Sequence, residues 1–91
     1  MEALSKFLQS KAKTKIVKFL YEHSDSDYSK TDISRGVKLS RPTVWTYIKQ
    51  LEGEGLVVLS RKVGNTTLYR INLKSPVVKQ LKKLEILGDH A

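Results

Sequence analysis

The feature that most constrains this fold is a pair of closely spaced helix signals in the middle of the chain. Residues 29–32 (Ser-Lys-Thr-Asp) match a capping box, in which a serine begins a helix and the acid three residues later bonds back to it. Lys38-Leu39-Ser40 is long enough only for a tight turn. Ser40 then caps a second helix, with Pro42 in its first turn, that runs to about Glu52 before two glycines. We therefore expect two short helices joined by a three-residue turn.

The flanking segments complete the order of elements. Before the pair, Ile16, Phe19, Leu20 and His23 recur at helical spacing behind a possible N-cap at Ser10. After the pair, residues 56–61 and 66–73 are rich in β-branched and aromatic side chains, and Gly64-Asn65 between them is a turn signal. Ser75-Pro76 begins a last helix. This order predicts a mainly α fold with a small β-hairpin (α+β), a winged helix-turn-helix with an extra C-terminal helix.

The length of the chain allows only one folded domain. Ninety-one residues have no room for two cores. We expect residues 1–10 to form an arm or short helix, residues 11–73 the winged helix-turn-helix domain, and residues 74–91 a C-terminal helix used in dimerisation. A core this small is marginal, so oligomerisation would supplement it.

The charge of the chain points to a polyanionic partner. Seventeen lysines and arginines against nine acids give a net charge of +8, and residues 55–84 contain seven basic residues and no acid. Nucleic acid is the commonest partner for such a surface, and an anionic membrane is the lesser alternative. The sequence has no cysteine and no apolar run near the ~20 residues that a membrane helix needs. We expect an intracellular, cytoplasmic and nucleoid-associated protein that does not enter a membrane.

The second helix of the pair has the composition of a DNA-reading helix. Val44, Ile48 and Leu51 define a buried face, and the opposite face carries the short hydroxyls, amide and cations that suit a major groove. The basic hairpin tip suits a minor groove or the backbone beside it, and the start of the preceding helix suits a phosphate. The predicted DNA-binding residues are Lys30, Thr31, Arg41, Pro42, Thr43, Trp45, Thr46, Lys49, Gln50, Arg61, Lys62, Asn65 and Thr66.

Trp45 has two interpretations that the sequence leaves open. It lies at the margin of the polar face, where it either packs against the hairpin or the leading helix, or contacts a thymine methyl group or a sugar. Tyr47 flanks the buried side and is expected to pack in the fold.

The sequence contains no motif that indicates catalysis. No glycine-rich phosphate loop is present, and His23 and His90 are not accompanied by carboxylates at metal-ligand spacing. His23 closes an apolar helix face and is expected to be structural. Asp89-His90 would bind a metal only with help from another subunit. We expect no enzymatic activity, no metal and no cofactor.

Residues 10–73 resemble the winged helix-turn-helix transcription regulators of bacteria and archaea. The stretch from Leu39 to Val57 is similar to the recognition helix, glycine stop and first wing strand of the arsenic-repressor (ArsR-like) group, with the multiple-antibiotic-resistance regulator group next. The resemblance implies that residues 61–67 form the wing and that the chain forms a homodimer through its terminal helices. It also implies that the major groove is contacted by Arg41, Pro42, Thr43, Trp45 and Thr46. The metal-sensing cysteines of that group are absent here.

The terminal segments carry apolar side chains that predict a dimer. An apolar face on a small domain needs a partner surface, and a two-fold dimer supplies one. The predicted interface residues are Leu4, Phe7, Leu8, Val77, Leu81, Leu84 and Leu87. A last helix that folds back on the leading helix of its own chain, giving a monomer, is the alternative.

We expect a homodimeric, sequence-specific regulator that binds double-stranded DNA and represses by occluding a promoter. One alternative is a winged helix used as a protein-interaction module, although the polar face of residues 41–52 argues against it. The other is an architectural DNA-binding protein with little sequence preference.

Overall fold

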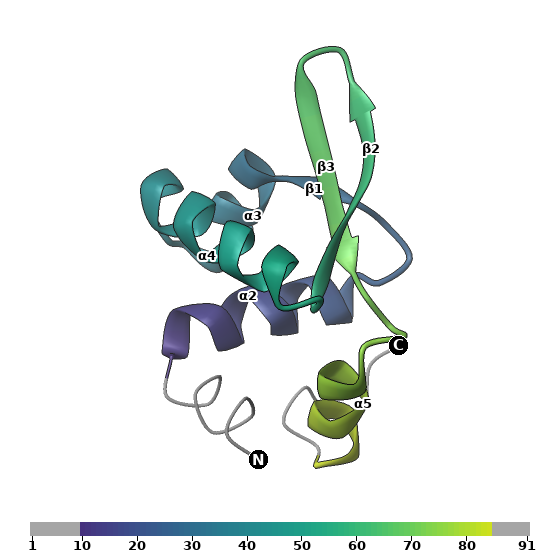
Figure 1. The fold of residues 1–91 in the computed structure, drawn as a ribbon. Coiled ribbons are helices and arrows are strands. Elements are labelled where there is room, and N and C mark those ends of the chain that lie inside the picture. Colours follow the sequence, from purple (N-terminus) through teal and green to yellow (C-terminus); the bar gives the residue numbers. More distant parts are fainter. Residues whose placement is uncertain (1–9, 85–91) are drawn as a thin grey trace.

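The computed structural model describes residues 10–84, and the predicted order of elements is confirmed (Figure 1). The elements are α2 (Lys11–Glu22), β1 (Tyr28–Ser29), α3 (Lys30–Val37), α4 (Arg41–Gly53), β2 (Val57–Val63), β3 (Thr66–Ile71) and α5 (Pro76–Lys83). The α+β winged helix-turn-helix class follows from this arrangement of helices and antiparallel strands.

Each helix within residues 10–84 begins after a serine that the sequence indicates as its N-cap. In each case the serine hydroxyl accepts a hydrogen bond from the backbone N–H three residues later, which satisfies one of the free donors of the first turn. The four pairs are Ser10 with Lys13, Ser29 with Asp32, Ser40 with Thr43, and Ser75 with Val78. Asp32 also accepts from the Ser29 N–H, which completes the capping box. Local side-chain chemistry thus fixes where each helix starts.

The turn between α3 and α4 is closed by backbone geometry. Lys38 lies in the left-handed region with φ 58°, and the N–H groups of Lys38 and Leu39 both donate to the Ser34 carbonyl. This arrangement ends α3 and leaves only three residues, 38–40, before α4 begins at Arg41. The predicted three-residue turn between the two helices is therefore confirmed.

The sheet has three antiparallel strands in the order β1-β3-β2, one strand more than the sequence predicted. The additional strand, β1, is two residues long and pairs Tyr28 with Tyr69 and Ser29 with Leu68. Two residues are too few to show an alternating pattern, so no periodicity marks this strand. The β2–β3 register shifts between Leu59 and Arg61, which places a bulge at the middle of β2.

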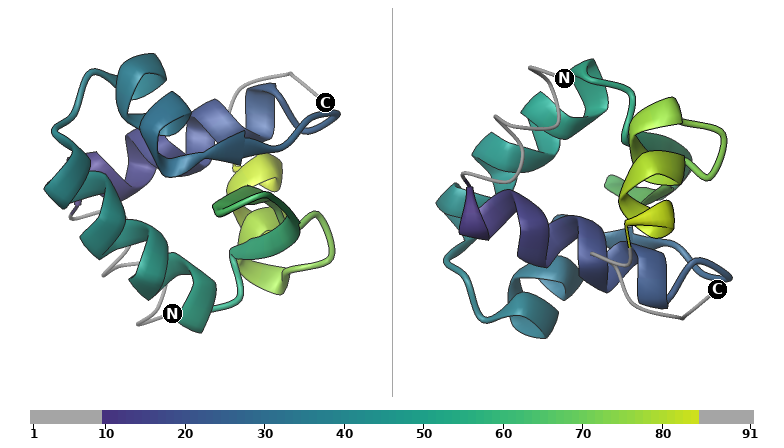
Figure 2. Two further views of the ribbon diagram at one scale, coloured as in Figure 1. Left: turned by 90° about the horizontal axis from the view of Figure 1, so that it is seen from above. Right: turned by 90° about the horizontal axis from the view of Figure 1, so that it is seen from below.

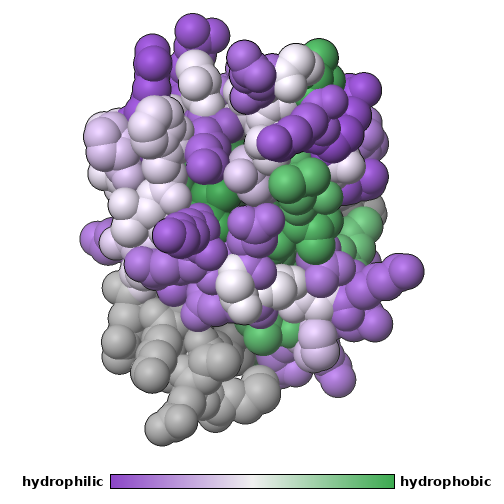
Figure 3. Space-filling view, turned by 45° about the horizontal axis from the view of Figure 1, so that its top comes forward, coloured by the Kyte–Doolittle hydropathy of each residue, from purple (hydrophilic) through white to green (hydrophobic). Residues whose placement is uncertain are grey.

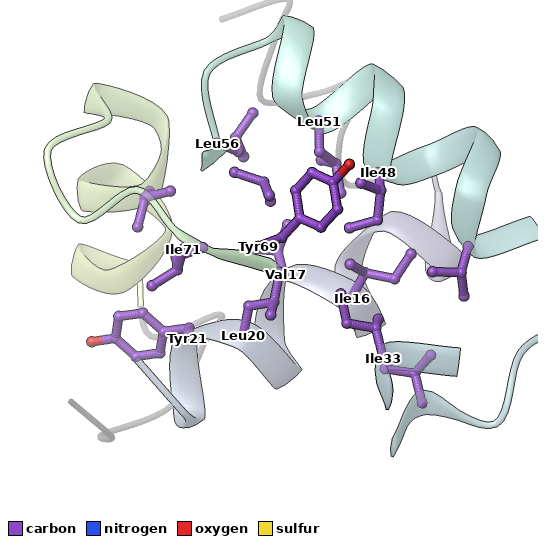
Figure 4. Packing of buried hydrophobic residues seen from close by; sticks show 14 of the residues in the cluster. Ile16, Val17, Leu20, Tyr21, Ile33, Ile48, Leu51, Leu56, Tyr69 and Ile71 are labelled. Carbon is purple, nitrogen blue, oxygen red and sulfur yellow. The ribbon is translucent and has the colours of Figure 1, made fainter. Parts of the chain in front are cut away.

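The core lies where α2, α3 and α4 meet the base of the sheet (Figure 4). Its largest fully buried side chains come from all of these elements and from α5: Tyr21, Ile16, Leu20, Ile33, Ile48, Leu51, Leu81, Val17, Val44, Val57 and Val78. Tyr47 packs against this cluster from the side, as expected.

The burial of α5 corrects part of the predicted dimer interface. Leu81 has no exposed surface and Val78 has almost none, because both side chains insert into the core of their own chain. The sequence assigned Leu81 to a partner surface on the assumption that the core was already closed without this helix. Val77 is also partly buried against the core, whereas Leu84 is 50% exposed. Leu4, Phe7, Leu8 and Leu87 lie outside the described residues.

Gly36 allows α3 to approach α2 closely. A Cβ built at this position would lie 2.7 Å from the Cζ of Phe19, closer than side chains tolerate. The Phe19 ring is itself held by His23 and Tyr28, with ring centroids 4.7 and 5.3 Å away. His23 therefore has a structural role, as predicted, and Gly36 has a packing role that its low helix propensity does not reveal.

The hairpin and α5 lie at opposite ends of the molecule. The β2–β3 tip extends away from the helices, and α5 lies on the far side of α2 (Figures 1 and 2). Within residues 10–84, no helix is long and apolar enough to cross a membrane.

Candidate nucleic-acid interface

Helix α4 presents the predicted polar face to solvent. Val44, Ile48 and Leu51 are fully buried, and this anchors one side of the helix in the core. An ion pair of 3.0 Å between Lys13 and Glu54 also ties the end of α4 to α2. On the other side, six of the predicted contact residues are exposed: Arg41, Pro42, Trp45, Thr46, Lys49 and Gln50. Thr43 is half-buried at the edge of this face.

The two threonine hydroxyls of α4 are already oriented by local hydrogen bonds. Thr46 Oγ1 donates to the Pro42 carbonyl at 2.9 Å, so its lone pairs remain free to accept. Thr43 Oγ1 accepts from Ser40 Oγ at 2.8 Å, so its own proton remains free to donate. The exposed Thr46 therefore offers an acceptor, which matches the amino groups of adenine and cytosine in a major groove.

An open cleft of about 300 Å³ separates α4 from the hairpin. It is lined by the start of α3, by Trp45 of α4 and by the hairpin turn: Ser29, Lys30, Thr31, Trp45, Asn65, Thr66 and Thr67. Five of the predicted DNA-binding residues meet here although they come from three separate parts of the sequence. The cleft joins the helix-turn-helix and the wing into one continuous surface.

Lys30 carries the positive charge of this cleft. Its Nζ lies 5.9 Å from the centroid of the Trp45 ring and 5.6 Å from that of Tyr69, within range of cation–π attraction. The two ion pairs found within residues 10–84 do not involve Lys30. Lys30 is half-buried, and its ammonium group lies near two aromatic faces rather than beside a carboxylate, which suits it to an incoming phosphate.

Trp45 lies at the edge of the polar face of α4. The side chain is 48% exposed, so much of its ring faces solvent. The ring faces the Lys30 ammonium group and lines the cleft together with the start of α3 and the hairpin turn. Its contact with a thymine methyl group or a sugar stays a prediction.

The wing residues divide into a free tip and a constrained base. Lys62, Asn65 and Thr66 are exposed near the tip. Arg61 is 65% exposed, but its Nε donates to Asp27 Oδ2 at 3.0 Å and its Nη2 donates to Oδ1 at 3.5 Å. Arg61 therefore has a partner within its own chain that the sequence analysis did not anticipate.

Asp27 contacts the wing, and the sequence did not predict this contact. Ser60 Oγ also donates to it, at 2.7 Å, so this one carboxylate binds both residues beside the bulge of β2. The hydrogen bonds from Ser60 and Arg61 lower the pKa of Asp27. Asp27 belongs to a Ser-Asp-Ser-Asp segment typical of any polar loop, so no local signal marks it. We call Asp27, Ser60 and Arg61 the wing clamp.

The face that contains the hairpin tip is largely hydrophilic, with hydrophobic surface in several places, the largest of them right of the centre of the view (Figure 3). The exposed large apolar residues of the hairpin are Val58, Leu59 and Val63. In the described part of the chain, no group of three or more histidines, cysteines or acids is positioned to hold a metal ion. The site is thus a polar and cationic surface that can bind an anion or a groove of a nucleic acid.

A capped helix pair with an exposed polar second helix, flanked by a basic wing, defines a winged-helix DNA-binding domain. The chain belongs to the winged helix-turn-helix DNA-binding family, whose model matches residues 9–58. This match covers α2 to the start of β2, including all of the helix-turn-helix.

Among solved structures, the chain is similar to one described as type III plasmid segregation TubR. The two superpose with a TM-score of 0.69 at 17% sequence identity, over 99% of this chain and 87% of the other. At this identity the similarity shows a common fold. A search of curated proteins found no match.

Proposed function

We propose that this chain is a sequence-specific transcription regulator that binds double-stranded DNA as a homodimer and represses by occluding a promoter. The observation that carries the proposal is the continuous surface formed by the exposed face of α4, the Lys30 cleft and the wing tip. The face of α4 is polar rather than apolar or acidic, which argues against a module that binds other proteins.

The three parts of this surface have different roles in the proposal. Helix α4 enters the major groove, where Arg41, Lys49 and Gln50 reach base edges. Lys30 and Thr31 at the start of α3 bind a phosphate, and so position the helix without reading sequence. Lys62, Asn65 and Thr66 of the wing bind the adjacent minor groove or its backbone.

We place the protein nearest to the arsenic-repressor (ArsR-like) group, on the resemblance of residues 39–57. A second candidate function is DNA segregation, as named in the description of the TubR structure. It is favoured because that similarity extends over 99% of the chain, including the wing and α5, which the family model does not cover.

The homodimer is proposed to form through the chain termini. Leu84 at the end of α5 is 50% exposed, and Leu4, Phe7, Leu8 and Leu87 are further apolar residues of the terminal segments. Leu81 is no longer included, because its side chain is used in the core. A two-fold dimer would set two copies of α4 about 34–36 Å apart, one turn of DNA.

Sedimentation velocity of two matched variants tests the dimer. Leu84→Glu introduces a charge at the proposed interface and should convert the protein to a monomer at tens of micromolar. Leu59→Glu makes the same change on β2, where Leu59 is 49% exposed, and should leave a dimer. A monomeric unmutated protein, or two variants that sediment alike, would contradict the proposed interface.

Selection of bound sequences from random duplex DNA tests the function. We expect a two-fold symmetric consensus with half-sites one helical turn apart. Failure to enrich any sequence would favour an architectural DNA-binding protein. If a consensus emerges, loss of the protein should change transcription of the genes that adjoin it. Loss of replicon maintenance with unchanged transcription would instead support DNA segregation.

A further inference from the structure

A second hollow lies between α2 and α5, remote from the DNA-binding surface. Its volume is about 280 Å³, near the lower end for small-molecule sites. It is lined by Tyr21 and Ser24 at the end of α2, by Leu73 after β3, and by Val78, Lys79 and Lys82 of α5. The hollow is therefore at the end of the molecule opposite the wing tip (Figure 1).

Tyr21 contributes a hydroxyl that has no partner. The residue is 1% exposed, and its hydroxyl forms no hydrogen bond within residues 10–84. The ring lies at the edge of the core, and its oxygen points away from the other labelled side chains (Figure 4). A buried hydroxyl without a partner destabilises the fold, so a ligand group that bonds to it removes that penalty.

The remaining walls of the hollow are apolar on one side and cationic on the other. Val78 is buried, whereas Leu73 is 47% exposed and extends the apolar surface outward. Lys79 and Lys82 are three residues apart, on one face of α5. Neither lysine belongs to an ion pair in the part of the chain that the structure describes. The hollow thus combines a hydroxyl donor, two ammonium groups without an ion pair among residues 10–84, and an apolar wall.

We propose that this hollow is a binding site for a small amphipathic carboxylate with a short aliphatic or aromatic body. The carboxylate accepts hydrogen bonds from the Tyr21 hydroxyl and pairs with Lys79 and Lys82, while its apolar body lies against Leu73 and Val78. A charged acceptor strengthens each of these hydrogen bonds relative to a neutral one. The site is independent of the DNA-binding proposal, because it shares no residue with that surface.

Titration of the full chain with octanoate, followed by amide chemical shifts, tests this proposal. We expect saturable shifts concentrated at residues 21–24 and 73–82. Octanol presents the same apolar body without the charge, and acetate presents the carboxylate without the body. Both should bind at least about tenfold more weakly than octanoate, since each loses one of the two kinds of contact.

Three variants localise the site. Tyr21→Phe should weaken octanoate binding several-fold without loss of stability, because it removes an unpaired hydroxyl from a folded core. Lys79→Ala combined with Lys82→Ala should weaken it about tenfold or more. Lys49→Ala combined with Lys62→Ala removes the same charge elsewhere and should leave octanoate affinity unchanged.

Four results would overturn the proposal. The first is the absence of saturable shifts, and the second is shifts centred away from this hollow. The third is equal binding of octanol or acetate. The fourth is octanoate affinity in the Lys79 and Lys82 double variant that matches the Lys49 and Lys62 control.

Discussion

Helix α4 and the wing contribute to the same surface but are held in different ways. Three fully buried side chains fix α4 in the core, so the orientation of its polar face follows from hydrophobic packing. The tip of the hairpin has no buried residue, and β2 buries only Val57 at its base. The orientation of the wing depends instead on pairing with β3 and on the clamp formed by Asp27, Ser60 and Arg61.

Because the two regions are held differently, we propose that sequence recognition and DNA affinity can be altered separately. A helix held by the core presents its side chains to a groove with little freedom, which suits base recognition. An exposed hairpin with a polar clamp can adjust to the backbone, which suits contacts that do not depend on sequence. Substitutions in the two regions should therefore differ in kind as well as in size.

The largest effect is expected from Ile48→Ala on the buried side of α4. Removal of this fully buried side chain should lower the free energy of unfolding by about 2–5 kcal/mol, because it leaves a cavity between α4 and the rest of the core. Chemical denaturation measures this loss. Gln50→Ala on the exposed side is the matched control and should change stability by less than about 0.5 kcal/mol. Equal losses for both variants would mean that α4 is not anchored as described.

Arg41→Ala and Lys62→Ala compare the two regions in DNA binding. Loss of Arg41 should cost about 1–3 kcal/mol on the selected duplex and relax preference at one base position. Loss of Lys62 should weaken binding to all duplexes alike. It should also make the slope of log K against log [salt] shallower by about one. Titrations against selected and scrambled duplexes measure both effects. If the two variants lose affinity equally on every sequence, Arg41 has no part in base recognition.

A smaller effect, dependent on pH, is expected from the wing clamp. The folded-state pKa of Asp27 lies below its unfolded value, so the clamp stabilises the fold at neutral pH. This contribution is lost as the pH falls below about 4 and through the folded-state pKa. Asp27→Asn should lower the melting temperature at pH 7 and reduce the further decrease between pH 5 and pH 2.

The control for this effect is Asp25→Asn, which removes the same charge from an exposed residue outside the clamp. Thermal unfolding of the three proteins across this pH range is the measurement. An Asp27→Asn variant with the melting temperatures and pH dependence of the unmutated protein would show that the clamp does not stabilise the wing.

The sequence predicts most of the fold because its strongest signals are local. Each serine cap bonds to a backbone group three residues away, and the buried side of α4 recurs at helical spacing. The wing clamp could not be predicted, since Asp27 and Arg61 are 34 residues apart and an aspartate in a polar loop is unremarkable. Leu81 was misassigned because an apolar face predicts burial but not whether the covering surface belongs to the same chain.

In the candidate site, too, the features set by local signals could be predicted and those set by distant residues could not. The exposed residues of α4 follow from the helical period, and the polar wing tip follows from its turn signal. The position of Lys30 between Trp45 and Tyr69 depends on β1, which places the start of α3 beside β3. A two-residue strand leaves no pattern in the sequence. The proximity of α3, α4 and the hairpin could therefore be found only from the structure.

The central claim is that this basic surface binds duplex DNA mainly through its phosphates, with α4 adding sequence preference. The most direct test is the affinity for a selected duplex measured over a range of salt concentrations. A dimer that neutralises ~6–10 phosphates should give a slope of about −5 to −9 in log K against log [salt]. A slope shallower than about −2 would contradict the account, because too few phosphates would be neutralised to explain binding through this surface.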